Sequence, residues 1–217
     1  MAARYDAIVL AGGRSSRMSG QAKPQLTIGE ATMLEHVLLA VRGAGTRVVV
    51  GPPQPVADGV LVIQEQPAGS GPVAGMSAGL VNISAPTVVV VAADLPFLAP
   101  EVIDRLVAAL GRSAGADVAL VVDQSGRDQY LLGAWRVAPL RTALARLAPL
   151  PGRAMGELVR AVNVTRIELP ATGDAPAPWI DVDTPADLDR ARATHRTWTR
   201  TQTGLSPEKV RSDRPQK

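Results

Sequence analysis

Short apolar runs alternate with amphipathic segments along most of the chain. The apolar, β-branched runs are typical of buried strands, and they cover residues 7–10, 47–50, 60–63, 87–92, 118–122, 130–135 and 164–169. Segments with apolar residues at helical spacing predict helices, and they cover residues 32–41, 73–81, 100–110, 140–147, 155–162 and the stretch from 185 onward. This alternation predicts an α/β domain with a mostly parallel sheet.

Several of these predicted elements carry further signals. Residues 87–92 form the most apolar β-branched run, so we place this strand at the centre of the sheet. Pro100 occupies the first helical position that proline favours. Thr184 and Pro185 likewise predict an N-cap and the first residue of the last helix.

The apolar periodicity ends near Thr194, which predicts one domain over residues 1–194 and a flexible basic tail over 195–217. The net charge is +3, and the tail alone holds six Lys or Arg against two acidic residues. The excess of positive charge therefore belongs to the tail. Aromatic residues make up only 3% of the chain, so neither charge nor stacking favours a nucleic-acid partner.

The chain of 217 residues contains no cysteine and two histidines. This excludes disulfides, a thiolate nucleophile and metal sites built on cysteine or on several histidines. The sequence has no apolar stretch of about 18 residues and no apolar run near its start that fits a signal peptide. We therefore expect no membrane span and a cytoplasmic location.

The loop after the first strand concentrates glycines and cations. Gly12 and Gly13 allow backbone N–H groups to approach a phosphate closely, and Arg14, Arg17 and Lys23 supply positive charge. The spacing fits neither a Walker A loop nor a Gly-x-Gly-x-x-Gly fingerprint. From these residues alone, a loop for a nucleoside triphosphate and an ordinary strand-to-helix turn both remain open.

The pattern Leu10-Ala11-Gly12-Gly13, then Arg17-Met, then Lys23 resembles the signature of nucleotidyltransferases, and most closely of the molybdenum cofactor guanylyltransferases. The resemblance implies a three-layer, Rossmann-like fold of the GT-A type. It also implies that the Leu-Ala-Gly-Gly backbone holds a guanine nucleotide and that the Arg and Lys bind its phosphates. Two positions depart from the family pattern, where Ser19 replaces a glycine and Ala22 an aspartate.

A second motif, Gly71-Pro72-Val-Ala-Gly75, opens a predicted helix. Such a start offers free N–H groups to a ligand, although small residues also allow tight packing of a helix on a sheet. In the resembling family this motif is associated with guanine selection. That family also has an acidic residue a few positions earlier that contacts the nucleotide, and Glu65 is the nearest match to it in this sequence.

Asp94 follows the predicted central strand, and no lysine or arginine nearby in sequence offers it a partner. In the family this aspartate binds Mg²⁺. Asp181 and Asp183 lie on the same side of an extended segment, where they could complete the metal site or orient a substrate. Guanylyltransferases of the family have Asn-x-Asn there, whereas related cytidylyltransferases often have Asp-x-Asp.

Two further segments, 127–133 and 151–155, resemble the region that receives the pterin substrate. Arg153 could bind the terminal phosphate of that substrate, although a solvated arginine fits the sequence equally well.

The resemblance implies transfer of GMP from GTP to the terminal phosphate of molybdopterin, with release of pyrophosphate. Arg17, Lys23 and Asp94 would be the catalytic residues and Mg²⁺ the cofactor. The pathway's biosynthetic or acceptor proteins would be its macromolecular partners. The alternatives are a molybdopterin cytidylyltransferase, another nucleotidyltransferase of this fold and a non-catalytic nucleotide-binding module. Leu-Ala-Gly-Gly and Gly71–Gly75 favour guanine, whereas Asp181 and Asp183 favour cytosine.

Overall fold

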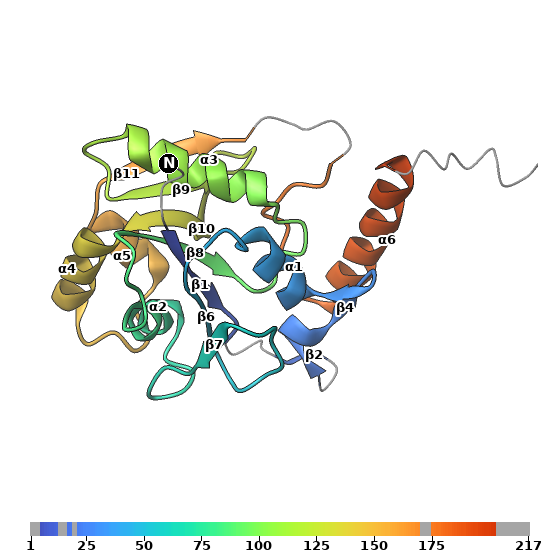
Figure 1. Ribbon diagram of the computed structural model, residues 1–217, viewed down its shortest axis with the longest axis horizontal. Helices are drawn as coiled ribbons and strands as arrows, with labels where there is room; N and C mark the ends of the chain where they lie inside the picture. Colours follow the sequence, from blue (N-terminus) through green and yellow to red (C-terminus); the bar gives the residue numbers. More distant parts are fainter. Residues whose placement is uncertain (1–4, 13–16, 19–20, 170–174, 203–217) are drawn as a thin grey trace, which may run out of the picture.

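A computed structural model describes residues 5–12, 17–18, 21–169 and 175–202. Its centre is a sheet of seven strands with helices on both faces (Figure 1). In sheet order the strands are β11 (Val164–Glu168), β9 (Val118–Val122), β10 (Asp128–Arg136), β8 (Thr87–Ala92), β1 (Tyr5–Leu10), β6 (Arg47–Val50) and β7 (Val60–Ile63). The predicted α/β class is confirmed.

The sheet is parallel except at β10, which runs antiparallel to both of its neighbours, β8 and β9. The strand β8 occupies the middle position, as its composition predicted, and Val88 to Val91 are completely buried there. Strands buried on both faces need apolar side chains at every position. This requirement explains the unbroken run of valines.

Helices form a layer on each face of the sheet. One face is covered by α1 (Met33–Ala40) and α3 (Pro100–Arg112), and the other by α2 (Pro72–Leu80), α4 (Val137–Leu147) and α5 (Met155–Arg160). Helix α2 packs very close to the sheet, since a Cβ atom at Gly79 would lie 2.9 Å from the Cδ1 atom of Ile8. The small residues of α2 thus permit its tight contact with β1.

The last helix, α6 (Pro185–Gln202), stands at the right of Figure 1, beside the hairpin of β4 (Thr27–Ile28) and β5 (Ala31–Thr32). A third, smaller apolar cluster joins the two and includes Ile28, Phe97 and Leu188. Among the described helices, none combines the length and the apolarity that a membrane crossing needs.

Part of the predicted tail belongs to α6, whereas the domain boundary that we placed after Thr194 stays a prediction. Residues 195–202 continue the helix rather than forming a tail, and residues 203–217 lie outside the described part of the chain. His195 packs edge-to-face on His36 of α1, with ring centroids 5.8 Å apart. The hydroxyl groups of Thr197 and Thr199 donate to carbonyl groups one turn earlier. Of these contacts, the one between His195 and His36 joins this part of α6 to the rest of the fold.

Candidate active site

A cleft of about 870 Å³ opens at the carboxyl ends of the parallel strands. Ligands of open α/β sheets bind at this edge. One half of the cleft is formed by the ends of β1, β6 and β8 and by the start of α2; the other half is formed by β10, the segment before α6 and one side of α6. The predicted site residues that line it are Leu10, Gly12, Glu65, Gly71, Pro72, Gly75, Asp94 and Asp181.

The backbone after β1 runs very close to the end of β6. Ala11 is buried, and its N–H group donates to the carbonyl of Val50 at 2.8 Å. A Cβ atom at Gly51 would lie 2.8 Å from the carbonyl carbon of Ala11, so Gly51 is needed here. This contact places Gly12 on the cleft surface. Residues 13–16, including Gly13, and the side chain of Arg17 lie outside the described structure.

The Gly71–Gly75 motif lies at the start of α2, as predicted. Gly71 is the N-cap with φ of +93°, a conformation that favours glycine, and a Cβ atom there would meet nothing within 4 Å. Gly75 serves packing as well as the cleft, because a Cβ atom there would lie 3.2 Å from the Cδ2 atom of Leu10. The helix start thus presents Gly71 and Pro72 to the cleft.

Glu65 is buried at the edge of this half of the cleft. Its Oε1 atom accepts a hydrogen bond of 2.9 Å from the N–H group of Gly69. A Cβ atom at Gly12 would lie 4.0 Å from the same oxygen. Glu65 therefore stabilises the loop before α2 through this hydrogen bond, and it lies near Gly12, the first glycine of the loop after β1.

The charged centre of the site is the side chain of Lys23, which is 6% exposed. Its Nζ atom lies 2.7 Å from Asp94 and 2.6 Å from Asp183. Burial alone would lower the pKa of Lys23, but the two carboxylates outweigh it and raise the pKa above its usual value. Lys23 thus carries a firmly held positive charge between carboxylates from two distant segments.

This geometry supplies the cationic partner that Asp94 lacks among its neighbours in sequence. Its partner is Lys23, 71 residues earlier in the chain. A carboxylate at the end of a buried strand does need a cation, and the fold brings one to it from the short helical turn Lys23–Gln25.

Asp181 lines the cleft beside this group. Burial, followed by the charges of Asp183 and Asp94, raises the pKa of Asp181 above its usual value. The three predicted metal-binding carboxylates therefore lie near one another, with Lys23 between two of them. No group of three or more acidic or histidine side chains among the described residues is arranged closely enough to hold a metal ion by itself.

Arg153 does not belong to the cleft lining. Its Nε atom donates to the carbonyl groups of Leu147 and Pro149 at 3.1 and 3.3 Å, and its Nη1 atom lies 2.9 Å from Glu157. These contacts tie the loop between α4 and α5 to the start of α5. The structure therefore places Arg153 outside this cleft, and its contact with the substrate stays a prediction.

The other pterin-related segment does reach the cleft. Because β10 is antiparallel and follows β9 through a short turn, the beginning of β10 lies at the cleft edge, and Arg127 to Leu132 line it. Asp123 holds the turn, since its Oδ1 atom accepts from the N–H groups of Ser125 and Arg127 at 2.8 and 3.0 Å. The antiparallel strand thus supplies the second half of the site.

The chain matches the model of the MobA-like NTP transferase domain over residues 7–163. This chain belongs to that family. It is 36% identical over 189 residues to a probable molybdenum cofactor guanylyltransferase of Mycobacterium avium, covering 83% of this chain and 91% of the relative. It is 30% identical over 203 residues to one of Pelotomaculum thermopropionicum, covering 88% and 96%. The predicted class of enzyme, a nucleotidyltransferase, is confirmed.

Solved structures of the same fold include molybdopterin-guanine dinucleotide biosynthesis protein A of Archaeoglobus fulgidus, with a TM-score of 0.70 and 24% identity over 88% of this chain and 99% of that one. Another is a 2-C-methyl-D-erythritol 4-phosphate cytidylyltransferase of Thermus thermophilus, with a TM-score of 0.66 and 23% identity over 89% and 99%. A third, from Mycobacterium tuberculosis, is a complex with manganese, with a TM-score of 0.65 and 21% identity over 89% and 100%. These likenesses confirm the predicted Rossmann-like fold.

Sequence reasoning missed several residues of this MobA-like cleft. Trp179 and Arg190 line it, yet neither lies in a motif that we recognised. The signal for Gly51 was present, because a glycine followed by two prolines ends the strand β6, but it indicated only a turn. The three-dimensional arrangement was needed to show that α6 forms one wall.

The raised pKa of Asp181 predicts a pH-dependent effect on the stability of this nucleotidyltransferase. A carboxyl whose pKa is raised by folding costs stability once it ionises, and the cost is absent at pH values below its ordinary pKa. Asp181→Asn should therefore raise Tm at pH 7.5 by about 1–3 °C, the scale of interactions between partly exposed charges. Near pH 3 the variant and the wild type should have the same Tm. Calorimetric scans at both pH values test this, and a lower Tm of the variant at pH 7.5 would contradict it.

Proposed function

We propose that this nucleotidyltransferase transfers GMP from GTP to the terminal phosphate of molybdopterin. The observation that carries the proposal is the group of Lys23, Asp94 and Asp183 beside a cleft with two distinct halves. The half at β1 and α2 contains the motifs that resemble a guanine nucleotide site, and the half at β10 remains for the acceptor. The names of the relatives from Mycobacterium avium and Pelotomaculum thermopropionicum support the same reaction.

The residues present fit a divalent cation of the magnesium type. Asp94 and Asp183 offer hard oxygen donors within reach of a single ammonium group, and Asp181 lies next to them. A bound Mg²⁺ would neutralise charge on the phosphate oxygens of the nucleotide. Asp94 and Asp183 would hold it, assisted by Asp181.

The chain's own residues contribute positioning and charge in this mechanism. The backbone at Gly12 and the start of α2 would place the nucleotide, and Lys23 and Arg17 would offset the negative charge of its triphosphate. The acceptor phosphate then attacks the α-phosphate, and pyrophosphate leaves. The mechanism needs no covalent enzyme intermediate, because both phosphates are held in one cleft and the reaction is a direct transfer.

A cytidylyltransferase acting on the same acceptor is the second candidate. The Asp-x-Asp segment favours it, since Asp181 and Asp183 stand where guanylyltransferases of the resembling family have asparagines. In the structure the carboxylate of Asp183 is bonded to Lys23 and does not itself line the cleft. Its position beside Lys23 favours a role in charge balance over a role in reading the base.

A panel of GTP, CTP, ATP and UTP with Mg²⁺, followed by calorimetry, tests the nucleotide. We expect GTP to bind at least about tenfold more tightly than the others, which corresponds to the loss of one or two hydrogen bonds with a wrong base. Pyrophosphate release on addition of molybdopterin tests the reaction. A preference for CTP would assign the cytidylyl reaction instead, and binding without pyrophosphate release would indicate a non-catalytic module.

A further inference from the structure

The half of the cleft assigned to the acceptor carries several carboxylates. Asp123, Asp128, Asp181 and Asp187 line this half of the cleft. A phosphate monoester that enters here carries negative charge towards these carboxylates and towards the triphosphate. Binding of the acceptor phosphate against this repulsion requires a cationic side chain in the same half of the cleft. Arg153, which the sequence offered for this role, points elsewhere.

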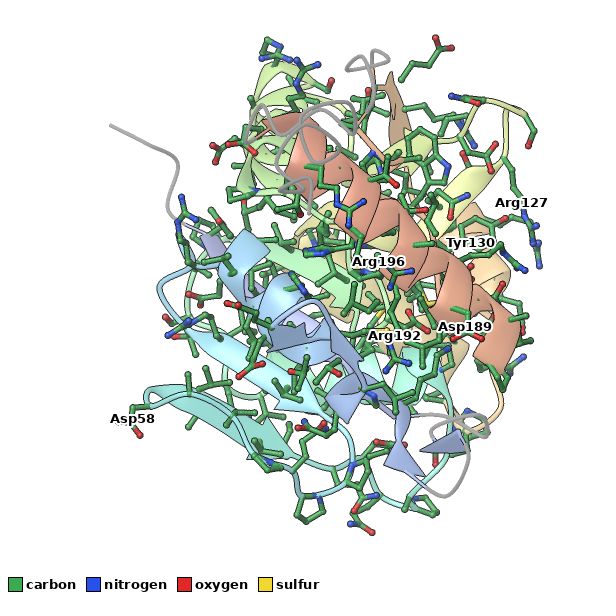
Figure 2. All side chains as sticks on the ribbon, turned by 90° about the vertical axis from the view of Figure 1, so that its right-hand side faces the viewer. Asp58, Arg127, Tyr130, Asp189, Arg192 and Arg196 are labelled. Atoms are coloured by element: carbon green, nitrogen blue, oxygen red, sulfur yellow. The ribbon has the colours of Figure 1, made fainter. Side chains whose placement is uncertain are left out.

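Arg127 and Arg190 are the two cationic side chains among the described residues that line the cleft. Arg127 lies in the turn between β9 and β10, at the outer end of the hairpin. Arg190 projects from α6, and its side chain is 71% exposed. Figure 2 looks onto α6, with Tyr130 and Arg127 beside the helix and Asp189, Arg192 and Arg196 along it.

One side of α6 faces the cleft. Asp187, Arg190, Ala191 and Thr194 line it, and their spacing of three and four residues places them on one helical stripe. Arg192 lies off this stripe and donates from Nε to the carbonyl of Thr27 at 3.0 Å. The helix is thus fixed to the hairpin β4–β5, while the exposed side chain of Arg190 lies along the cleft.

Asp187 connects Arg190 to the charged centre of the site. Its Oδ2 atom accepts from the N–H groups of Thr184 and Asp183, at 2.7 and 3.2 Å, and from the Thr184 hydroxyl at 2.7 Å. Its Oδ1 atom binds the Nη2 atom of Arg190. The hydrogen bonds from Thr184 lower the pKa of Asp187, so this carboxylate stays ionised. Asp183, whose N–H group it holds, contacts Lys23.

From these contacts we propose that Arg190 binds the terminal phosphate of the acceptor and that Asp187 positions it. This inference rests on the proposed function and adds the residue that receives the second substrate. Arg190 is favoured over Arg127 because Asp187 ties it directly to the segment that carries Asp183 and Asp181. A guanidinium group can bind two phosphate oxygens at once, which also orients the attacking oxygen.

The test varies molybdopterin at saturating GTP and Mg²⁺ and follows pyrophosphate release. Arg190→Gln should raise the KM for molybdopterin about tenfold or more, the effect of losing a charged hydrogen bond, while the Kd for GTP changes less than twofold. The KM of Arg190→Lys for molybdopterin should lie between those of the wild type and of Arg190→Gln. An ammonium group keeps the positive charge but cannot bind two phosphate oxygens as a guanidinium group does. Arg196→Gln, on the same helix but outside the cleft lining, is the matched control and should behave as the wild type.

The positioning role of Asp187 has its own readout. Asp187→Asn should raise the same KM in the wild type but add nothing to it in the Arg190→Gln background, because the aspartate acts through the arginine. An unchanged KM in Arg190→Gln, with an active wild type, would overturn this inference and leave the proposed function standing. A wild type that releases no pyrophosphate with any of the four nucleotides would overturn the proposed function, and the inference with it.

Discussion

Asp94→Asn should lower kcat for pyrophosphate release by about 30- to 1,000-fold, or about 2–4 kcal/mol, the range found when one charge-stabilising group of a preorganised site is removed. Asp94 lies two residues after the end of the central strand β8, lines the cleft and contacts Lys23 at 2.7 Å. The substitution keeps the shape of the side chain and removes its charge. Titration of Mg²⁺ should also show a higher concentration for half-maximal activity.

The protein should still fold with this substitution, because Lys23 keeps its contact with Asp183 and the asparagine oxygen can accept its hydrogen bond. Asp58→Asn is a matched control, since Asp58 is exposed and lies far from α6 in Figure 2. If Asp94→Asn kept normal turnover and an unchanged requirement for Mg²⁺, the assignment of Asp94 to the metal would be wrong.

Lys23→Met should have the largest effect on stability. Removing one partner of a buried ion pair costs about 3–5 kcal/mol, and we expect about 2–3 kcal/mol here because the Asp183 side chain is 61% exposed. For a chain of this length that lowers Tm by roughly 5–10 °C. We expect the loss of stability to come from repulsion between Asp94, Asp181 and Asp183 once the ammonium group is gone. A packing defect should contribute little, because methionine fills much of the same space.

The dependence of the Tm of Lys23→Met on pH and on Mg²⁺ distinguishes charge repulsion from poor packing. Protonation of Asp181, whose pKa is raised by burial and by the neighbouring carboxylates, reduces the repulsion, so the Tm difference from the wild type should shrink as the pH falls to about 3. Millimolar Mg²⁺ should raise the Tm of the variant more than that of the wild type. Calorimetric scans check both, and a Tm deficit that is the same at every pH and Mg²⁺ concentration would show that the charges are not responsible.

The sequence alone predicted the order of the strands and helices and the motifs that line the β1 and α2 half of the cleft. Buried strands and amphipathic helices follow local periodicity, so the central position of residues 87–92 and the helix starts at Pro72 and Pro100 were predictable. The motifs at Gly12 and Gly71 follow strands or begin helices, and the fold therefore places them at the cleft edge.

The ion pairs could not be predicted, because they join segments that are remote in sequence. Lys23 meets Asp94 and Asp183 across 71 and 160 residues, and no local pattern encodes such a contact. The role of α6 was missed for a similar reason. The C-terminal part of α6 lacks an apolar stripe, so its sequence does not predict a helix. It is nevertheless helical, and its His195 packs against His36.

The single antiparallel strand, β10, brings a hairpin turn to one side of the cleft. The turn at residues 123–127 closes a hairpin whose strands are already paired within the sheet, so its length and sequence can change without disturbing the loops of β1 and α2. Changes in this turn should therefore alter the half that we propose for the acceptor and leave the half that we propose for the nucleotide intact. For protein engineering, a hairpin tip grafted from a relative with another acceptor would change this side of the cleft and leave those loops in place.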